Sequence, residues 1–121
     1  MAVGHGVQGT PGEAKVDAAM ARRVADVMQA LATPSRVSIL ARLRDGSCSV
    51  TELAEAVGME PSAVSQQLRV LRHLRLVVGE RSGRKVMYAL HDSHVGVLLA
   101  EAVFHVEHVH LGVVDRASEA S

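Results

Sequence analysis

Apolar residues recur at helical spacing over most of the first 74 residues, and this periodicity predicts four helices. The first runs over about residues 16–31. The second begins at Thr33-Pro34, a hydroxyl cap followed by a first-turn proline, and stops at Asp45-Gly46. A third, short helix begins at the capping box of residues 49–52, and a fourth runs over about residues 61–74. A tight turn containing glycine joins the last two helices, which is typical of a helix-turn-helix.

After residue 74 the pattern changes to two short β-prone runs, residues 76–78 and 86–90, which flank a basic segment with a central Ser-Gly pair. This arrangement predicts a two-stranded hairpin with a basic tip. A last helix, capped by Asp92 or Ser93, is expected to end near Val109. Together these elements describe a mainly α fold with a small β-hairpin, a winged helix-turn-helix.

The winged helix-turn-helix occupies residues 16–110 in this interpretation. Residues 1–15 are rich in glycine and are expected to form a flexible arm, and residues 111–121 are expected to form a C-terminal tail. The 121 residues are enough for one domain, and a 48% hydrophobic and 21% charged composition is typical of a chain with a folded core. No apolar run approaches the roughly 20 residues of a membrane span, and the start lacks a secretory pattern, so we expect a cytoplasmic protein.

The distribution of charge narrows the class of partner. The formal net charge is zero, but residues 60–90 carry six Lys/Arg against two Asp/Glu, whereas residues 91–121 carry one against five. A basic middle indicates a polyanion-binding segment, and the acidic end indicates a segment that prefers cations. Because the chain has one Tyr, one Phe and no Trp, its core must be aliphatic. For the same reason the protein is unsuited to bind single-stranded nucleic acid by stacking bases on aromatic side chains.

The fourth predicted helix has one apolar and one polar face. Val64, Leu68 and Leu71 form a stripe that should be buried. On the opposite face, hydroxyls can contact phosphates or base edges and Gln can pair with adenine, which suits the major groove of double-stranded DNA. Cations at the hairpin tip would neutralise flanking phosphates. The expected DNA-binding residues are therefore Ser62, Ser65, Gln66, Arg69, Arg81, Arg84 and Lys85. Gln67 lies between the two faces, and its alternative role is that of a buried hydrogen-bonding residue instead of a DNA contact.

Five of the seven histidines fall in residues 91–110, where the last helix is expected. On a helix, His94 and His105 share a face to within about 20°, and His108 lies on the same side. Eleven residues rise about 16 Å, however, whereas metal–ligand bonds are about 2 Å long. Two antiparallel copies of the helix can bring these residues to one ion, because the start of one helix then lies beside the end of its partner. The expected ligands are Asp92 and His94 of one chain with His105 and His108 of the other. The spacing thus predicts a homodimer packed through its terminal helices, with two equivalent metal sites.

These nitrogen and oxygen donors suit Zn²⁺, Ni²⁺ or Co²⁺. Four ligands complete a tetrahedral zinc site, whereas octahedral nickel or cobalt needs about two more, for which His110 and His5 are available. Cys48 is the only cysteine, so an internal disulfide or a multi-cysteine site is excluded. We expect Cys48 to be a small, partly buried residue, with redox sensing as the alternative.

Three stretches, residues 31–36, 50–54 and 62–68, resemble the ArsR/SmtB family of bacterial winged-helix repressors. The resemblance covers about residues 16–110. It implies a repressor that binds operator DNA as a homodimer and releases it on metal binding. It also implies the same four ligands on the last helix. Gln66 departs from the pattern, because metal-sensing relatives often have His there.

The pair Gly4-His5 and the segment His108-x-His110 are similar to the NmtR-type nickel/cobalt sensors of that family. This resemblance implies that His5 and His110 join the site and that the repressor controls a metal efflux gene. The alternatives are a zinc-responsive repressor of the same family and a winged-helix regulator without metal sensing, in which the histidines form a polar dimer seam. A metallohydrolase would need an open coordination position and a general base. A helix pair without a pocket argues against it, so we do not expect an enzyme.

Overall fold

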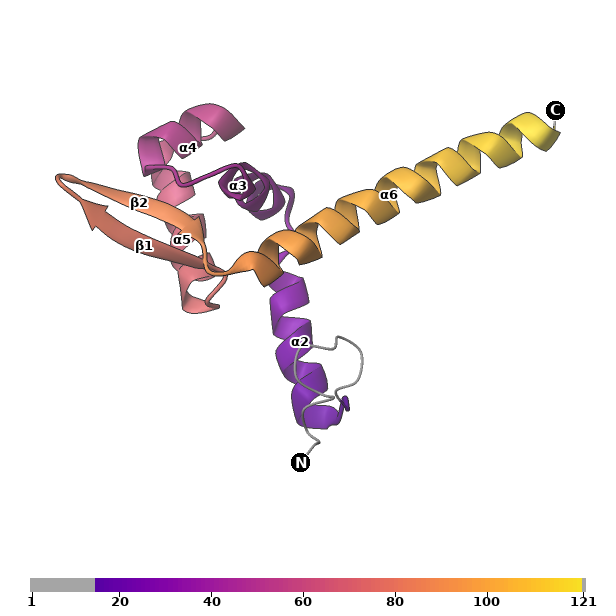
Figure 1. The fold of residues 1–121 in the computed structure, drawn as a ribbon, viewed down its shortest axis with the longest axis horizontal. Helices are drawn as coiled ribbons and strands as arrows, with labels where there is room; N and C mark the ends of the chain where they lie inside the picture. Colours follow the sequence, from indigo (N-terminus) through magenta and orange to yellow (C-terminus); the bar gives the residue numbers. More distant parts are fainter. Residues whose placement is uncertain (1–14, 121) are drawn as a thin grey trace.

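The computed structural model describes residues 15–120, and it describes the side chains of residues 15–109. This part of the chain forms α2 (Ala18–Ala30), α3 (Pro34–Arg44), α4 (Val50–Val57), α5 (Pro61–His73), β1 (Val77–Ser82), β2 (Lys85–Leu90) and α6 (Ser93–Ala120). Helices α3, α4 and α5 pack together with the hairpin, whereas α2 and the long α6 extend away from that body (Figure 1). The winged helix-turn-helix predicted from the sequence is confirmed.

The helices begin at the predicted caps. Thr33 accepts a hydrogen bond from the backbone N–H of Arg36 at the start of α3, with Pro34 in the first turn. Ser49 and Glu52 form the reciprocal capping box of α4, in which the Ser49 hydroxyl accepts from Glu52 N at 3.2 Å and the Glu52 carboxylate accepts from Ser49 N at 2.9 Å. These local bonds satisfy N–H groups that would otherwise lack partners.

The core is aliphatic, as the composition predicts. Val64, Leu68 and Leu71 of α5 are fully buried, so the predicted stripe is confirmed. Gln67 is half-buried, and its Oε1 accepts a hydrogen bond from Arg36 Nε at 2.8 Å. Arg36 therefore ties α3 to α5, and Gln67 is the hydrogen-bonding residue that its position between the faces indicated.

The hairpin is attached to the helical body through a buried cysteine. Cys48 and Tyr88 exchange both backbone hydrogen bonds, at 2.9 and 2.7 Å, and Cys48 is 0% exposed. Ser82 pairs with Lys85, which leaves a two-residue loop, and Gly83 adopts a φ of +65° there. A two-residue hairpin loop needs a positive φ at its first position, which glycine adopts without strain.

A left-handed residue ends α5 and sets the direction of β1. Leu76 N donates to Leu71 O and Arg75 N donates to Arg72 O, both at 2.9 Å, which is the Schellman pattern. Arg75 has a φ of +61° in a position that usually holds glycine. Leu71 and Leu76 are both buried, so this connection packs into the core.

Helix α6 does not end where the sequence predicted. The predicted end near Val109 is wrong, because α6 passes through Gly112 and continues to Ala120. One glycine inside a helix costs only about 1 kcal/mol relative to alanine, and no proline follows it to stop the helix. The predicted arm lies outside the described residues except for Lys15, and the division of the chain at residues 15 and 110 stays a prediction. None of the helices in residues 15–120 has the length and apolarity that a membrane span requires.

Candidate functional site

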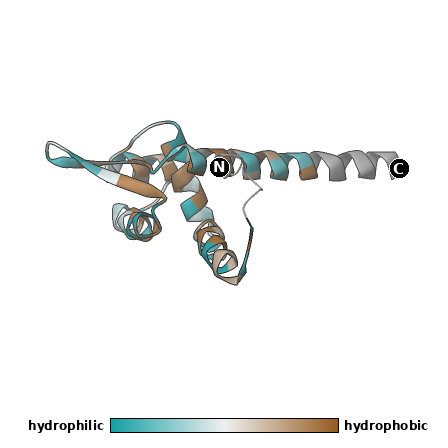
Figure 2. Ribbon diagram, turned by 60° about the horizontal axis from the view of Figure 1, so that its bottom comes forward, coloured by the Kyte–Doolittle hydropathy of each residue, from teal (hydrophilic) through white to brown (hydrophobic). Residues whose placement is uncertain are grey.

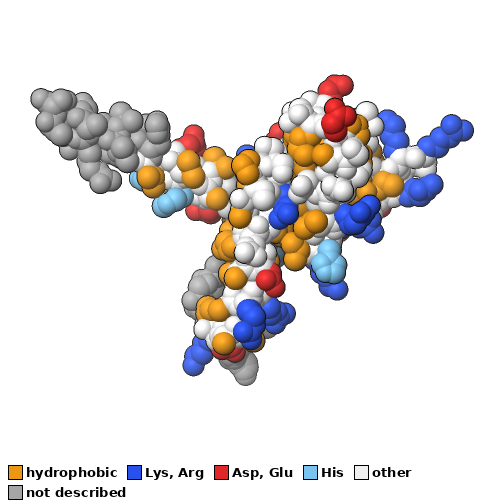
Figure 3. All heavy atoms as spheres, turned by 180° about the vertical axis from the view of Figure 1, so that it is seen from behind, with side chains coloured by type: hydrophobic (Ala, Val, Ile, Leu, Met, Phe, Trp, Pro, Cys, Tyr) orange, Lys and Arg blue, Asp and Glu red, His pale blue; other side chains and the backbone are white. Residues whose placement is uncertain are grey.

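The predicted DNA-reading residues lie on the outer face of α5. Ser62, Gln66 and Arg69 are exposed and Ser65 is half-buried, on the side away from the buried stripe. The hairpin cations Arg81, Arg84 and Lys85 are also exposed. Figure 3 shows Lys and Arg side chains gathered at the hairpin end of the molecule. The reading helix and the cationic hairpin therefore offer a polar, positively charged surface of the kind that DNA backbones attract.

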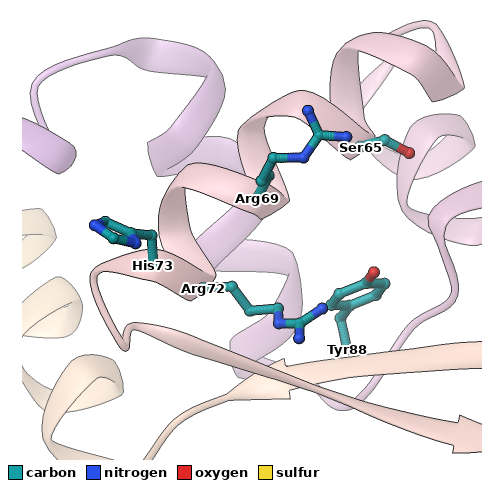
Figure 4. Close-up of a pocket in the computed structure, with 5 residues that line it drawn as sticks. All are labelled: Ser65, Arg69, Arg72, His73 and Tyr88. Atoms are coloured by element: carbon teal, nitrogen blue, oxygen red, sulfur yellow. The ribbon is translucent and has the colours of Figure 1, made fainter.

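A cavity of about 590 Å³ lies between α5 and the hairpin. It is lined by Ser65, Arg69, Arg72, His73 and Tyr88 (Figure 4). Sequence reasoning singled out Ser65 and Arg69 but missed Tyr88, which reaches this cavity from β2. The only available signal was that Tyr88 is the single tyrosine of the chain, in a strand that follows the basic tip.

Asp92 and His94 lie together at the start of α6. Asp92 Oδ1 accepts hydrogen bonds from His94 N at 2.9 Å and Val95 N at 3.3 Å, so Asp92 caps the helix. The His94 ring is 90% exposed, and its Nδ1 lies 3.5 Å from the same Asp92 oxygen. Asp92 Oδ2 lies 3.1 Å from Nδ1 of His91. That hydrogen bond from His91, with the two backbone N–H groups, lowers the pKa of Asp92 and keeps it a carboxylate.

His105 and His108 lie further along α6 and are exposed. The ring of Phe104 packs on the ring of His108, with centroids 5.4 Å apart and planes tilted by 34°. Because eleven helical residues rise about 16 Å, this pair is out of reach of Asp92 and His94 in the same chain. His110 lies where side chains are not described, and His5 lies outside the described residues.

The candidate ligands of one chain therefore lie as two separate pairs. In residues 15–109 no three His, Cys, Asp or Glu side chains come close enough to hold one metal ion. The four candidates offer nitrogen and oxygen donors, and they are exposed on a single helix. This donor set fits a Zn²⁺, Ni²⁺ or Co²⁺ ion only if a second chain completes it.

An apolar surface runs along α2 and α6. Val106 is 65% exposed, and Val103 and Val109 of α6 and Val24 and Met28 of α2 are also exposed apolar residues. A groove of about 330 Å³ lies beside it between α6 and the α2–α3 corner, lined mostly by apolar residues such as Leu31, Val37 and Leu99. Figure 2 marks hydrophobic residues along both projecting helices, and Figure 3 shows hydrophobic side chains on them. Exposed apolar side chains gathered beside a groove on projecting helices indicate an interaction surface.

Comparison with known proteins agrees with the winged helix-turn-helix fold. The model of the arsR family of bacterial regulatory proteins matches residues 33–78. The HTH-type transcriptional regulator NmtR of Mycobacterium tuberculosis is 57% identical, over 98% of this chain and 99% of NmtR.

Two solved structures share the fold. The solution structure of apo-NmtR has a TM-score of 0.69 at 58% identity, covering 88% of this chain and 91% of that one. The homodimeric winged helix-turn-helix DNA-binding domain Mb0332 of Mycobacterium bovis has a TM-score of 0.71 at 31% identity, covering 81% of this chain and 91% of that one. The chain belongs to the ArsR family of bacterial regulatory proteins, and it is a winged-helix transcriptional regulator rather than an enzyme.

Proposed function

We propose that this protein is a metal-responsive transcriptional repressor. It binds operator DNA as an apo homodimer and dissociates when Ni²⁺ or Co²⁺ binds. The observation that carries the proposal is the pair of incomplete ligand sets on α6, on a helix whose apolar surface is uncovered. The metal responsiveness is the step beyond the family assignment, and control of a metal efflux gene follows from the same resemblance.

A second copy of the chain is the proposed occupant of the α2–α6 surface. Only the C-terminal end of α2, at Val27, Ala30 and Leu31, packs against the body of its own chain. Val24 and Met28 stay exposed on the same helix. The homodimeric relative Mb0332 supports this assignment. In the antiparallel arrangement, burial of this surface brings the two incomplete ligand sets together.

The metal would be held by Asp92 and His94 of one protomer with His105 and His108 of the other. Exposed imidazole and carboxylate groups are ready donors, and the hydrogen bonds of Asp92 already hold its carboxylate at the helix start. His110 and His5 would supply the further donors that six-coordinate nickel or cobalt requires. When bound, the ion supplies a link between the start of one α6 and the middle of the other.

Release of DNA requires that the metal bind one dimer conformation more tightly than the other. A metal with equal affinity for both conformations would shift nothing. A metal that links two α6 helices can favour one dimer conformation, because each α6 packs on α3. Arg36 of α3 in turn donates a hydrogen bond to Gln67 of the reading helix α5. A change in the angle between protomers would then move one α5 relative to the other on the operator.

A zinc-responsive repressor of the same family is the second candidate. The observation that favours it is that Asp92, His94, His105 and His108 are all exposed, and four such donors complete a tetrahedron without His5 or His110.

The test is an equilibrium titration of purified apo protein with Ni²⁺, Co²⁺ and Zn²⁺ while its affinity for a duplex from its own promoter is followed. The proposal predicts tight binding by the apo protein and a loss of at least about fivefold in affinity with two Ni²⁺ or Co²⁺ per dimer, the lower end of typical allosteric coupling. Metal binding without any change in DNA affinity would contradict the proposal.

A further inference from the structure

The cavity between α5 and the hairpin is cationic and lacks a compensating carboxylate. Arg69, Arg72 and His73 line it, together with the hydroxyl-bearing Ser65 and Tyr88. Within the described side chains, no Arg or Lys lies within 4.0 Å of a carboxylate oxygen, since the ion pairs found there join only His91 and His94 to Asp92. A concave site lined by fixed positive charge raises the local concentration of anions.

The backbone holds Tyr88 in place at the edge of this cavity. Its N–H and C=O are both bonded to Cys48, and it pairs across the hairpin with Gly79. A Cβ at Gly79 would lie 3.0 Å from Cε1 of Tyr88, so the ring occupies space that only glycine leaves free. The Tyr88 ring therefore packs over Gly79 of the facing strand. Figure 4 shows the Arg72 guanidinium directed toward the Tyr88 ring.

We propose that this cavity binds one phosphate of the DNA backbone, with Arg72 and Arg69 as the cationic donors and the Tyr88 hydroxyl as a neutral donor. The cavity lies between the face of α5 that carries Gln66 and the hairpin that carries Arg84 and Lys85. A strand leaving the major groove toward the hairpin must pass this position. Paired guanidinium and hydroxyl donors suit a phosphodiester, because both can donate to its charged oxygens.

The proposal rests on the DNA-binding function and adds two residues to it, Arg72 and Tyr88. A phosphate contact carries no sequence information, so its loss must weaken binding to any duplex equally. Arg72→Ala is expected to lower affinity roughly tenfold for both operator and unrelated DNA, and to reduce the slope of log K against log salt by about one. Tyr88→Phe removes a neutral donor and keeps the ring, so it should cost about threefold with no change in slope.

The experiment measures dissociation constants of the full-length apo protein for operator and unrelated duplexes over a salt series. Arg44→Ala is the matched control, because Arg44 is an exposed arginine on α3 that does not line the cavity. Thermal melting checks that each variant is folded, and Arg72→Lys, which keeps the charge, should retain the salt slope. If Arg72→Ala behaves like Arg44→Ala, or weakens operator binding alone, the phosphate assignment is wrong. Failure of the wild type to bind any duplex would instead contradict the proposed function.

A free anion is the competing occupant, and a second measurement distinguishes it. Tyr88 is the only tyrosine and the chain has no tryptophan, so its intrinsic fluorescence reports on this cavity alone. In a titration with inorganic phosphate, we expect at most a weak response that Arg72→Ala removes. Saturation at sub-millimolar phosphate would reassign the cavity to a free anion and overturn the DNA-phosphate proposal.

Discussion

Asp92 and His94 are joined twice at the start of α6. The backbone N–H of His94 donates to Asp92 Oδ1 at 2.9 Å, and the His94 ring Nδ1 lies 3.5 Å from the same oxygen. The carboxylate that caps the helix is therefore also the one proposed to bind metal. Folding of α6 places both donors before any metal arrives, which lowers the entropic cost of binding.

Substitutions at Asp92 can separate these two roles. Asn caps a helix as well as Asp does, so Asp92→Asn should keep a melting temperature close to that of the wild type. It removes the anionic donor, so its metal affinity should fall by more than the 10–100-fold typical of an outer-shell partner. Asp92→Ala should lower both metal affinity and melting temperature. Thermal melts of the apo variants and competition titrations with a chelator check both. An Asp92→Ala variant that melts at the wild-type temperature would show that the cap is unimportant.

Arg75 offers a test of the connection between α5 and β1. Its left-handed backbone, with φ +61°, is costly for a residue with a Cβ. Arg75→Gly should therefore stabilise the apo protein by roughly 1 kcal/mol, which corresponds to a rise of a few degrees in melting temperature. The control is Arg75→Ala, which should give no such rise. A fall in melting temperature for Arg75→Gly would mean that the side chain contributes more than the backbone strain costs.

The hairpin tip and the reading helix should respond differently to substitution. Arg84→Ala and Lys85→Ala are expected to weaken DNA binding for all sequences and to reduce its salt dependence, because exposed cations at the tip meet phosphates. Gln66→Ala should instead change the discrimination between operator variants by about 1–3 kcal/mol for the base it contacts. Binding assays on a set of operator variants over a salt series measure both. Unchanged affinity and slope in the hairpin variants would show that the wing is not on the DNA.

Coordination number should identify the cognate metal. Deleting residues 1–6 or changing His110→Ala is expected to impair the Ni²⁺ or Co²⁺ response more than Zn²⁺ binding, because only six-coordinate ions need these donors. Recruiting His5 must order a glycine-rich segment, which costs entropy that four-coordinate zinc has no reason to offset. The absorption spectrum of the Co²⁺ complex is the check, since weak bands indicate six-coordination. Intense tetrahedral bands that survive the deletion would favour the zinc-responsive alternative.

The sequence predicts this fold well where the signals are local. Thr33, Ser49 and Pro61 act within a few residues of themselves, and the helices begin where they indicate. The end of α6 is not local in this sense, because a single glycine at residue 112 is compatible with either a stop or a continuing helix.

The candidate sites also differ in whether local sequence signals predict them. The proximity within each candidate ligand pair is local, since Asp92 caps the helix in whose first turn His94 lies, and His105 and His108 are three positions apart on α6. The Tyr88 cavity depends on the pairing of Tyr88 with Gly79 and Cys48, which are distant in sequence. The helical stripe does not predict His91, because its contact with Asp92 comes from the turn before α6.

The proposed metal site forms between two protomers, and complementation in mixed dimers is the most direct test of this arrangement. One chain carries Asp92→Asn with His94→Ala, and the other carries His105→Ala with His108→Ala. Each variant alone forms a homodimer in which both sites are incomplete. In the heterodimer, purified with two different tags, one site recovers all four donors and the other loses all four.

Equilibrium titration with Zn²⁺ or Co²⁺ then counts the sites. A shared site predicts two tight sites in the wild-type dimer, none in either variant homodimer and one of wild-type affinity in the heterodimer. A heterodimer that binds no more tightly than the two homodimers would contradict a site shared between chains.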